Sequence, residues 1–163
     1  MIPIRYLTSA LTAFFCATAP ALADTHLSTR EGAFTHWSYF CDDICWISTL
    51  TTDREMYIFV AFQGAQSVEL SVYFADGRRF PNAPTTMTVG CITDAFLLAE
   101  NTGFPSDFDA NDRLLEQFLF ADTGTVQVGD TTRTFLLEGY EPAFEAVGPP
   151  LPAPSASPCP GSS

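Results

Sequence analysis

Apolar and polar residues alternate with a period of two along much of the chain, and this pattern predicts strands. The segment "VELSVYF" (68–74) alternates most strictly, with its apolar side chains at Val68, Leu70, Val72 and Phe74. The segment "EMYIFVAF" (55–62) is almost continuously apolar and predicts a central strand. Shorter segments of strand character are "FTHWSYF" (34–40), "ICWISTL" (44–50), "TMTVGCI" (86–92), "FLLAE" (96–100), "TVQV" (125–128) and "TRTFLLEG" (132–139).

Two turn signals connect these segments. Asp42 and Asp43 favour a turn between the segments 34–40 and 44–50. The pair "DG" at 76–77 is a strong hairpin signal, and we expect the strand 68–74 to return through "RRF" (78–80).

Helical spacing appears in one segment, where apolar residues recur at Leu114, Leu115, Phe118 and Leu119. It predicts a short helix at about 109–119 with Asp109 as the N-cap. The segment 141–147 is compatible with a final helical turn, with Pro142 near its start. The predicted fold is therefore mainly β, a compact antiparallel β-sandwich or barrel-like domain with one short helix.

The composition changes at both ends and predicts the domain bounds. Residues 1–23 combine Arg5, an apolar stretch and the small residues "ALA", which is typical of a signal peptide cleaved after Ala23. The apolar stretch is shorter than the roughly 20 residues that cross a bilayer. No other apolar run is long enough either, so no transmembrane segment is predicted in the mature chain. We expect one domain over 24–147, loosely ordered at 24–33, and a proline-rich extended tail over 148–163. The predicted location is the periplasm or the extracellular space.

The charge of the chain excludes some partners. It has seven arginines, no lysine and 19 acidic residues, which gives a net charge of −12 at pH 7. Such a chain repels phosphate backbones and anionic membrane surfaces. Nucleic acid is therefore not an expected partner.

The cysteines predict a disulfide framework. Cys16 lies in the signal peptide, and the four others allow three connectivities in an oxidising compartment. A hairpin with a three-residue loop would set Cys41 directly opposite Cys45, so we favour that bond, worth about 2 kcal/mol. Cys91 and Cys159 form the remaining pair, with a disulfide from Cys159 to a partner as the alternative. The chain offers too few further ligands for zinc.

The segment "DFDANDRLLEQF" (107–118) copies part of a calcium-loop spacing, with Asp107, Asp109 and Asn111 at its first, third and fifth positions. It lacks the glycine at position six and the bidentate carboxylate at position twelve. Helix capping explains these residues more simply. We predict neither a metal nor a cofactor.

Two groups of residues are candidate ligand contacts. An aromatic platform for a sugar or a peptide would consist of Trp37, Tyr39, Trp46 and Tyr57. Aromatic residues in a β-rich chain more often fill the core, which is the alternative interpretation. Arg78 and Arg79 would contact an acidic ligand or form a salt-bridged hairpin end.

No catalytic constellation is visible. The chain has no G-x-S-x-G motif, and His36 is the one histidine within the predicted domain that could serve as a base. We expect a protein that is not an enzyme. The alternative is a small exported hydrolase whose carboxylate pair meets only in the fold.

Three segments resemble the invasion-associated locus B family of exported alphaproteobacterial proteins: "FTHWSYFC…CWIS", "NDRLLEQFLFADTGTVQV" and "TRTFLLEGYEPAFEAV". The resemblance spans residues 34–147. It implies a compact β-sandwich-like domain with a helix, in the periplasm or on the outer surface, and some members are linked to host-cell invasion. No catalytic residue is established for the family, so none is transferred. We therefore expect an exported binding or envelope-associated protein whose partner is a protein or glycan of the envelope or of a host surface.

Overall fold

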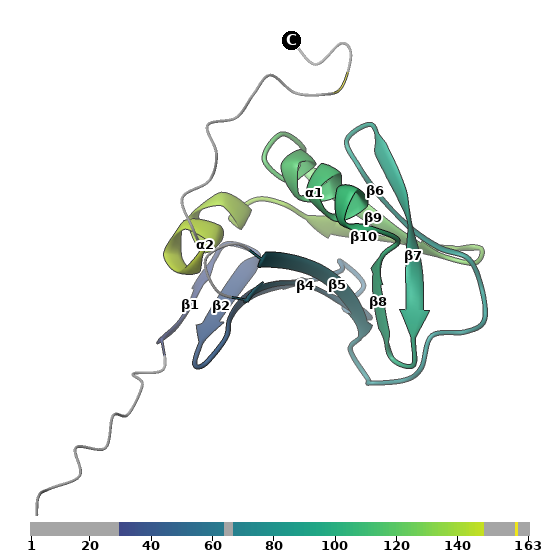
Figure 1. The fold of residues 1–163 in the computed structure, drawn as a ribbon, viewed down its shortest axis with the longest axis horizontal. Coiled ribbons are helices and arrows are strands. Elements are labelled where there is room, and N and C mark those ends of the chain that lie inside the picture. Colours follow the sequence, from purple (N-terminus) through teal and green to yellow (C-terminus); the bar gives the residue numbers. More distant parts are fainter. Residues whose placement is uncertain (1–29, 64–66, 149–158, 160–163) are drawn as a thin grey trace, which may run out of the picture.

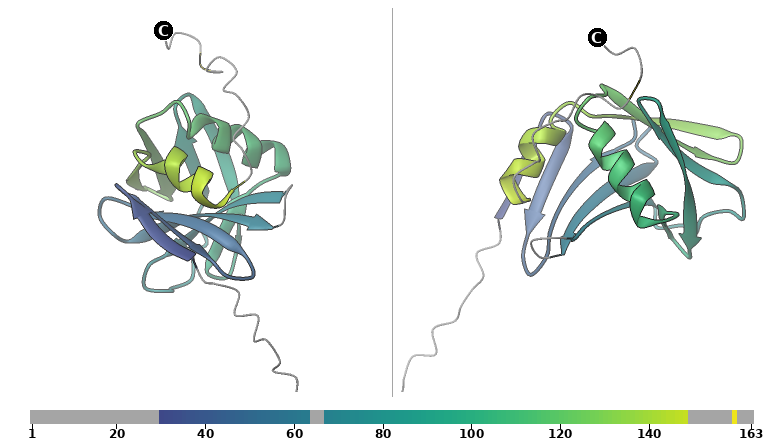
Figure 2. Two further views of the ribbon diagram at one scale, coloured as in Figure 1. Left: turned by 90° about the vertical axis from the view of Figure 1, so that its left-hand side faces the viewer. Right: turned by 45° about the horizontal axis from the view of Figure 1, so that its top comes forward.

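A computed structural model describes residues 30–63, 67–148 and 159. These residues form a ten-stranded antiparallel sheet and two helices, which lie on one side of the sheet (Figures 1 and 2). The predicted mainly β fold with disulfides is confirmed. The predicted signal peptide lies outside the described residues, and so does the tail apart from Gly148 and Cys159.

The strands follow one another around the sheet in the order β1-β2-β3-β4-β5-β8-β7-β6-β9-β10. Their bounds are β1 (Arg30–Phe34), β2 (Trp37–Cys41), β3 (Cys45–Leu50), β4 (Met56–Gln63), β5 (Ser67–Phe74), β6 (Thr85–Val89), β7 (Ile92–Ala99), β8 (Thr102–Pro105), β9 (Thr123–Val128) and β10 (Thr131–Leu136).

The sheet curls until its last strand meets the end of β3. Thr51 forms an isolated antiparallel bridge with Phe135, and the Thr52 N–H donates to the Thr134 carbonyl at 2.7 Å. We call this contact the seam. Strands β3 to β10 thereby form a barrel with one short closing contact, and the β1–β2 hairpin extends beyond it (Figure 1).

The core lies inside the curl because alternate residues of each strand point inward. On β5 the predicted inward face is confirmed at Leu70, Val72 and Phe74, each at most 5% exposed. The helices α1 (Phe108–Gln117) and α2 (Tyr140–Val147) pack against this core. The buried side chains with which they close its open side include Leu114, Tyr140, Ala143 and Phe144.

Both helices differ from the sequence prediction. The N-cap of α1 is Asp107 rather than Asp109, because the Asp107 carboxylate accepts the Ala110 N–H at 2.7 Å. Asp109 lies in the first turn, where its charge complements the helix dipole. The expected final turn is a complete second helix, α2. It follows Gly139 at φ 92°, where a Cβ would collide with the Phe34 carbonyl.

Three strand predictions are wrong in detail. No strand returns through residues 78–80 after the "DG" turn, because β5 pairs instead with β8, which the sequence pattern did not indicate. The segment 86–92 is divided by a turn at Gly90, whose φ of 57° joins β6 to β7 as a hairpin. β1 begins at Arg30, so the last residues of the stretch expected to be loosely ordered pair with β2.

The favoured disulfide and the remaining predicted pair are both present. Cys41 lies directly opposite Cys45 in the β2–β3 register, with 4.0 Å between their Cα atoms. Cys91 is bonded to Cys159, with 5.6 Å between their Cα atoms. That bond leaves no thiol at Cys159 for a disulfide-linked partner. Within the described ranges, no helix has the length and hydropathy to cross a membrane.

Candidate functional site

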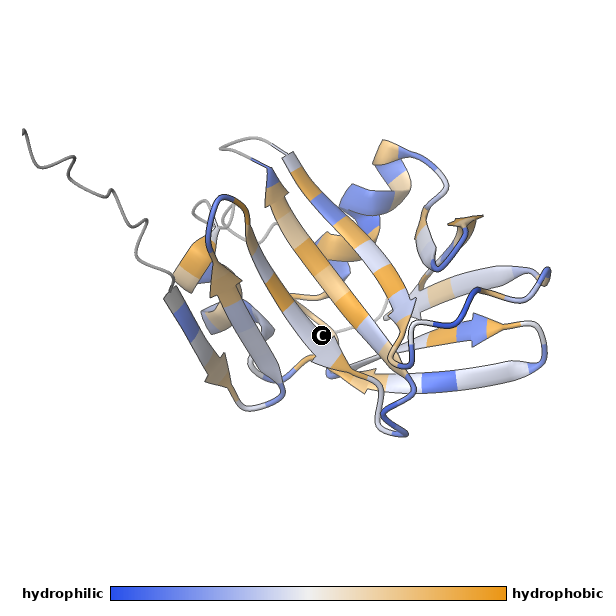
Figure 3. Cartoon of the chain, turned by 90° about the horizontal axis from the view of Figure 1, so that it is seen from below, coloured by the Kyte–Doolittle hydropathy of each residue, from blue (hydrophilic) through white to orange (hydrophobic). Residues whose placement is uncertain are grey.

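The outer face of the sheet carries a row of aromatic side chains. The inward residues of β2 to β5 fill the core, so the residues between them point away from it. Five of these outward residues touch one another and are partly exposed, and we call them the aromatic row: Phe40, Trp46, Tyr57, Phe59 and Tyr73. Figure 3 shows the sheet from this side, with the helices behind it.

The row crosses four strands without a break. Phe40 stacks on Trp46, its direct cross-strand partner, with 5.3 Å between ring centroids and 27° between ring planes. Phe59 then meets Trp46 at 5.3 Å, Tyr57 at 5.5 Å and Tyr73 at 5.2 Å. Aromatic neighbours at these distances stabilise one another in tilted or edge-to-face geometry. The row is therefore a continuous apolar surface on a rigid sheet.

A groove of about 700 Å³ begins where the row ends at Tyr57. We call it the hydroxyl groove, because its lining includes Thr35, Ser38, Ser48, Thr49, Thr51, Thr52 and Tyr57. Ser38 and Ser48 face each other across β2 and β3, with 3.3 Å between their Oγ atoms. His36 and Arg54 add charged or titratable side chains at the rim. The groove thus places hydrogen-bonding groups beside the apolar row.

The described contacts of His36 are with Glu138 and Thr49. Its side chain is 41% exposed, and its Nε2 lies 3.9 Å from Oε2 of Glu138. The Thr49 hydroxyl donates to the backbone carbonyl of His36 rather than to its ring. These contacts are those of a surface histidine at the rim of the groove.

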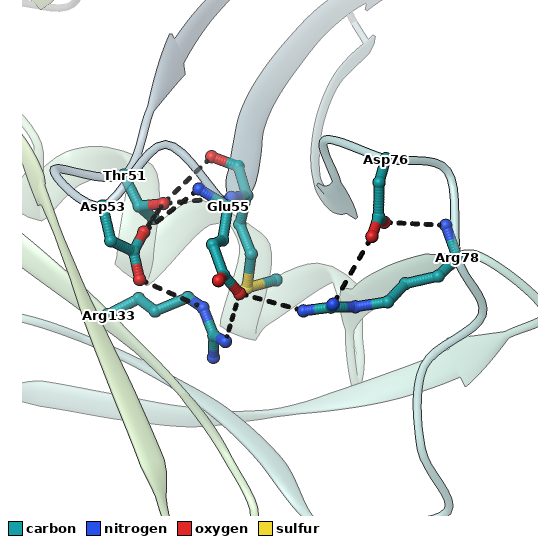
Figure 4. A network of polar contacts seen from close by, with 7 residues as sticks. Thr51, Asp53, Glu55, Asp76, Arg78 and Arg133 are labelled. Carbon is teal, nitrogen blue, oxygen red and sulfur yellow. Dashed lines mark hydrogen bonds and ion pairs between the residues drawn. The ribbon is translucent and has the colours of Figure 1, made fainter.

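A cluster of arginines and carboxylates lies at one end of the barrel (Figure 4). Oε2 of Glu55 accepts hydrogen bonds from Nη2 of Arg78 at 2.9 Å and from Nη2 of Arg133 at 2.8 Å. Asp53 forms an ion pair with Nε of Arg133 at 3.3 Å, and Asp76 with Nη1 of Arg78 at 3.4 Å. The sequence separation of 78 residues between Glu55 and Arg133 made this network invisible to sequence patterns.

The carboxylates of this network have lowered pKa values. Hydrogen bonds from Arg133 and Arg78 hold the pKa of Glu55 below its usual 4.5. Partial desolvation raises the pKa of Asp53. Hydrogen bonds from the Thr51 hydroxyl and the Glu55 N–H, together with the charge of Arg133, outweigh this effect, so the net pKa lies below the usual 3.8. A catalytic general acid needs a raised pKa. Neither Asp53 nor Glu55 has the raised pKa of a general acid.

The predicted aromatic platform is half wrong. Trp37 is completely buried, and its Nε1 donates to the Leu136 carbonyl at 3.0 Å across the seam. Tyr39 also points inward and stacks on Phe34 at 5.8 Å. Trp46 and Tyr57 do lie on the outer face. The sequence pattern did not indicate the remaining members of the row, although Phe40 lies an odd number of positions from Trp37 and therefore on the opposite face of the strand.

Arg78 and Arg79 differ in their contacts. Arg78 forms ion pairs, as in the interpretation of a salt-bridged hairpin end, but it lies in a loop and not at the end of a hairpin. Arg79 is exposed and makes no hydrogen bond or ion pair with the described residues. The two side chains line the same small pocket together with Arg133.

The calcium candidate residues have structural partners. Asp107 caps α1. Asn111 is 7% exposed and pairs with the open edge of β5, accepting the Leu70 N–H at 2.8 Å and donating to the Val68 carbonyl at 2.9 Å. Across the described ranges, no group of three or more His, Cys, Asp or Glu side chains could hold a metal ion.

Comparison with family models, with curated proteins and with solved structures found no match for this chain. The resemblance to the invasion-associated locus B family stays a prediction.

Proposed function

We propose that this chain is an exported, non-enzymatic binding protein of the periplasm or the outer surface. Its ligand is a neutral glycan chain that lies along the aromatic row and enters the hydroxyl groove. The observation that carries this proposal is the unbroken contact of five partly exposed aromatic side chains on the outer face.

The chemistry of the surface supports a sugar ligand. A pyranose ring presents a face of C–H groups, which packs on an aromatic ring, and an edge of hydroxyls, which needs hydrogen-bond partners. The aromatic row offers the first surface, and Ser38, Ser48 and Tyr57 offer the second. The net charge of −12 disfavours an acidic glycan. The two disulfides favour an oxidising compartment.

The two tryptophans provide a direct test. Trp37 is completely buried, whereas Trp46 is a partly exposed member of the row. Acrylamide therefore quenches the fluorescence of Trp46 preferentially. We expect a neutral polysaccharide that binds the row to protect Trp46 from quenching, with a concentration dependence that gives the affinity.

Two variants identify the surface. Phe59→Ala removes the centre of the row, and we expect it to weaken glycan binding about tenfold, as loss of a stacked aromatic contact worth about 1–3 kcal/mol would. The matched control is Phe108→Ala, which removes a side chain that is 89% exposed on α1, away from the row. We expect it to leave the affinity unchanged.

Other outcomes would contradict the proposal in separate ways. Equal losses in both variants would show that any exposed aromatic residue contributes, and the row would not be the site. Protection of Trp46 by an envelope protein but by no glycan would make the partner a protein. New reducing ends released from the bound glycan would contradict the non-enzymatic part of the proposal.

A further inference from the structure

A second pocket lies at the end of the barrel that holds the arginine and carboxylate network. It has a volume of about 300 Å³ and is formed by the loop after β5 and the β9–β10 hairpin. Arg78, Arg79 and Arg133 line it, with Phe74 and Val128 among the remaining residues. We call it the arginine pocket.

The arginine pocket occupies the mouth of the barrel. Phe74 is an inward residue of β5, Val128 is an inward residue of β9, and Arg133 lies on the same face of β10 as the buried Phe135. Barrel mouths are common places for small-molecule sites, because side chains of several strands converge there around an apolar floor. The volume corresponds to the smallest of such sites.

Basic side chains are concentrated in the lining of the pocket. Three of the seven arginines line it, although the chain has 19 acidic residues, and none of the described lining residues is acidic. The carboxylates of Asp53, Glu55 and Asp76 contact the guanidinium groups from outside this lining.

Two of the guanidinium groups are held in place before any ligand arrives. Glu55 binds both Arg78 and Arg133 through one oxygen. The guanidinium carbon of Arg78 lies 4.1 Å from the centre of the Phe74 ring, and that of Arg133 lies 5.6 Å from it. Such cation–π contacts fix the planes of the guanidinium groups.

Hydrogen-bonding capacity also remains in the pocket. The Arg133 side chain is only 9% exposed, and its Nε is already paired with Oδ2 of Asp53 at 3.3 Å. Arg79 is exposed and has neither an ion pair nor a hydrogen bond within the described ranges. A positioned pair of arginines beside an uncommitted third suits an incoming anion.

We propose that the arginine pocket binds a small ligand that carries an oxyanion on an apolar body. The planar donors of arginine match the oxygens of a carboxylate or a phosphate, often through two parallel hydrogen bonds. The apolar part of the ligand contacts Phe74 and Val128. This site is separate from the aromatic row, and the proposal does not depend on a glycan ligand.

The test is a titration followed by amide chemical shifts, at constant ionic strength and with both disulfides intact. The probes are phenyl phosphate and benzoate, with inorganic phosphate for comparison. We expect shifts confined to residues 74–81 and 128–133. At least one aromatic probe should bind about tenfold more tightly than inorganic phosphate, because only the aromatic probes reach the apolar floor. The tighter of the two identifies the oxyanion.

Two charge-matched variants complete the test. Arg79→Gln removes an exposed side chain without described partners, so the fold should be unaffected and the affinity should fall about tenfold, the loss of one charge-assisted hydrogen bond. Arg113→Gln is the control, because Arg113 lies on α1 and pairs with Asp94 outside the pocket.

Three results would overturn the proposal. They are equal weakening by both variants, shifts that centre outside the pocket, and no preference for either aromatic probe over inorganic phosphate. The glycan test is independent, because Arg79→Gln leaves the aromatic row unchanged. Failure at one site is therefore distinguishable from failure at the other.

Discussion

The two tryptophans occupy opposite faces of neighbouring strands. Trp37 on β2 is completely buried and is hydrogen-bonded across the seam to Leu136. Trp46 on β3 lies outside, between Phe40 and Phe59 in the aromatic row. The same residue type therefore closes the barrel on one face and offers a contact surface on the other.

The register between β2 and β3, and not the residue type, determines which tryptophan is buried. Because Cys41 lies opposite Cys45, the inward positions of β3 are Cys45, Ile47 and Thr49. Trp46 then has to point outward. A slip of one residue in a β-pair would move every side chain of the strand to the other face. The Cys41–Cys45 bond excludes that slip, so it stabilises the assignment of faces as well as the turn.

The largest expected effect separates the two tryptophans by stability. Trp37→Ala should lower the free energy of unfolding by about 3–5 kcal/mol, because it leaves a cavity in the core and an unpaired Leu136 carbonyl. Trp46→Ala removes only partly exposed contacts and should cost about 1 kcal/mol. Urea denaturation followed by circular dichroism measures both losses without using tryptophan fluorescence. Equal losses would contradict the assignment of the two faces.

The next effect tests the register. Replacing Cys41 and Cys45 together by serine should cost about 2 kcal/mol, the chain-entropy value for a very short loop. The strand pairs on the β4 side still oppose a slip, so Trp46 should stay as accessible to acrylamide as before. A large change in the quenching of Trp46 in the folded variant would show that the disulfide alone fixes the register.

Local patterns predicted much of this fold. The alternation over 68–74 identified the inward face of β5, and the spacing of Leu114 and Phe118 identified the buried side of α1. The opposition of Cys41 and Cys45 followed from a hairpin with a short loop. In each case, the decisive contacts lie within one strand, one helix or one turn.

Long-range pairing could not be predicted in the same way. The "DG" turn predicts that β5 pairs with a return strand over 78–80. In the fold β5 pairs instead with β8, through only two residue pairs. The burial of Trp37 is a second example, because its hydrogen-bond partner, Leu136, is 99 residues away. The arginine pocket likewise combines the loop after β5 with the β9–β10 hairpin, so no local motif indicates it.

The smallest expected effect concerns the turn between β3 and β4, which contributes residues both to the hydroxyl groove and to the mouth of the barrel. Thr51 and Thr52 of this turn line the hydroxyl groove, whereas Glu55 binds Arg133 in the mouth of the barrel. The pKa values of Asp53 and Glu55 are lowered in the folded state. Their contribution to stability is therefore complete above their usual values of 3.8 and 4.5, and it is lost as pH falls through the lower folded-state values.

The variant Glu55→Gln isolates this contribution. It should lower the urea midpoint slightly at pH 7, where the ion pairs are formed, and much less at pH 3, where protonation has already weakened them in the unmodified protein. The difference between the two proteins should therefore shrink as pH falls. Glu145→Gln is the control, because it lies on the exposed side of α2 and removes a charge without an arginine partner in the described contacts. Curves that stay parallel for Glu55→Gln would mean that Glu55 does not stabilise the seam. The seam would then depend on the other described contacts, namely the Trp37–Leu136 hydrogen bond, the Asp53–Arg133 ion pair and the backbone contacts of Thr51 and Thr52.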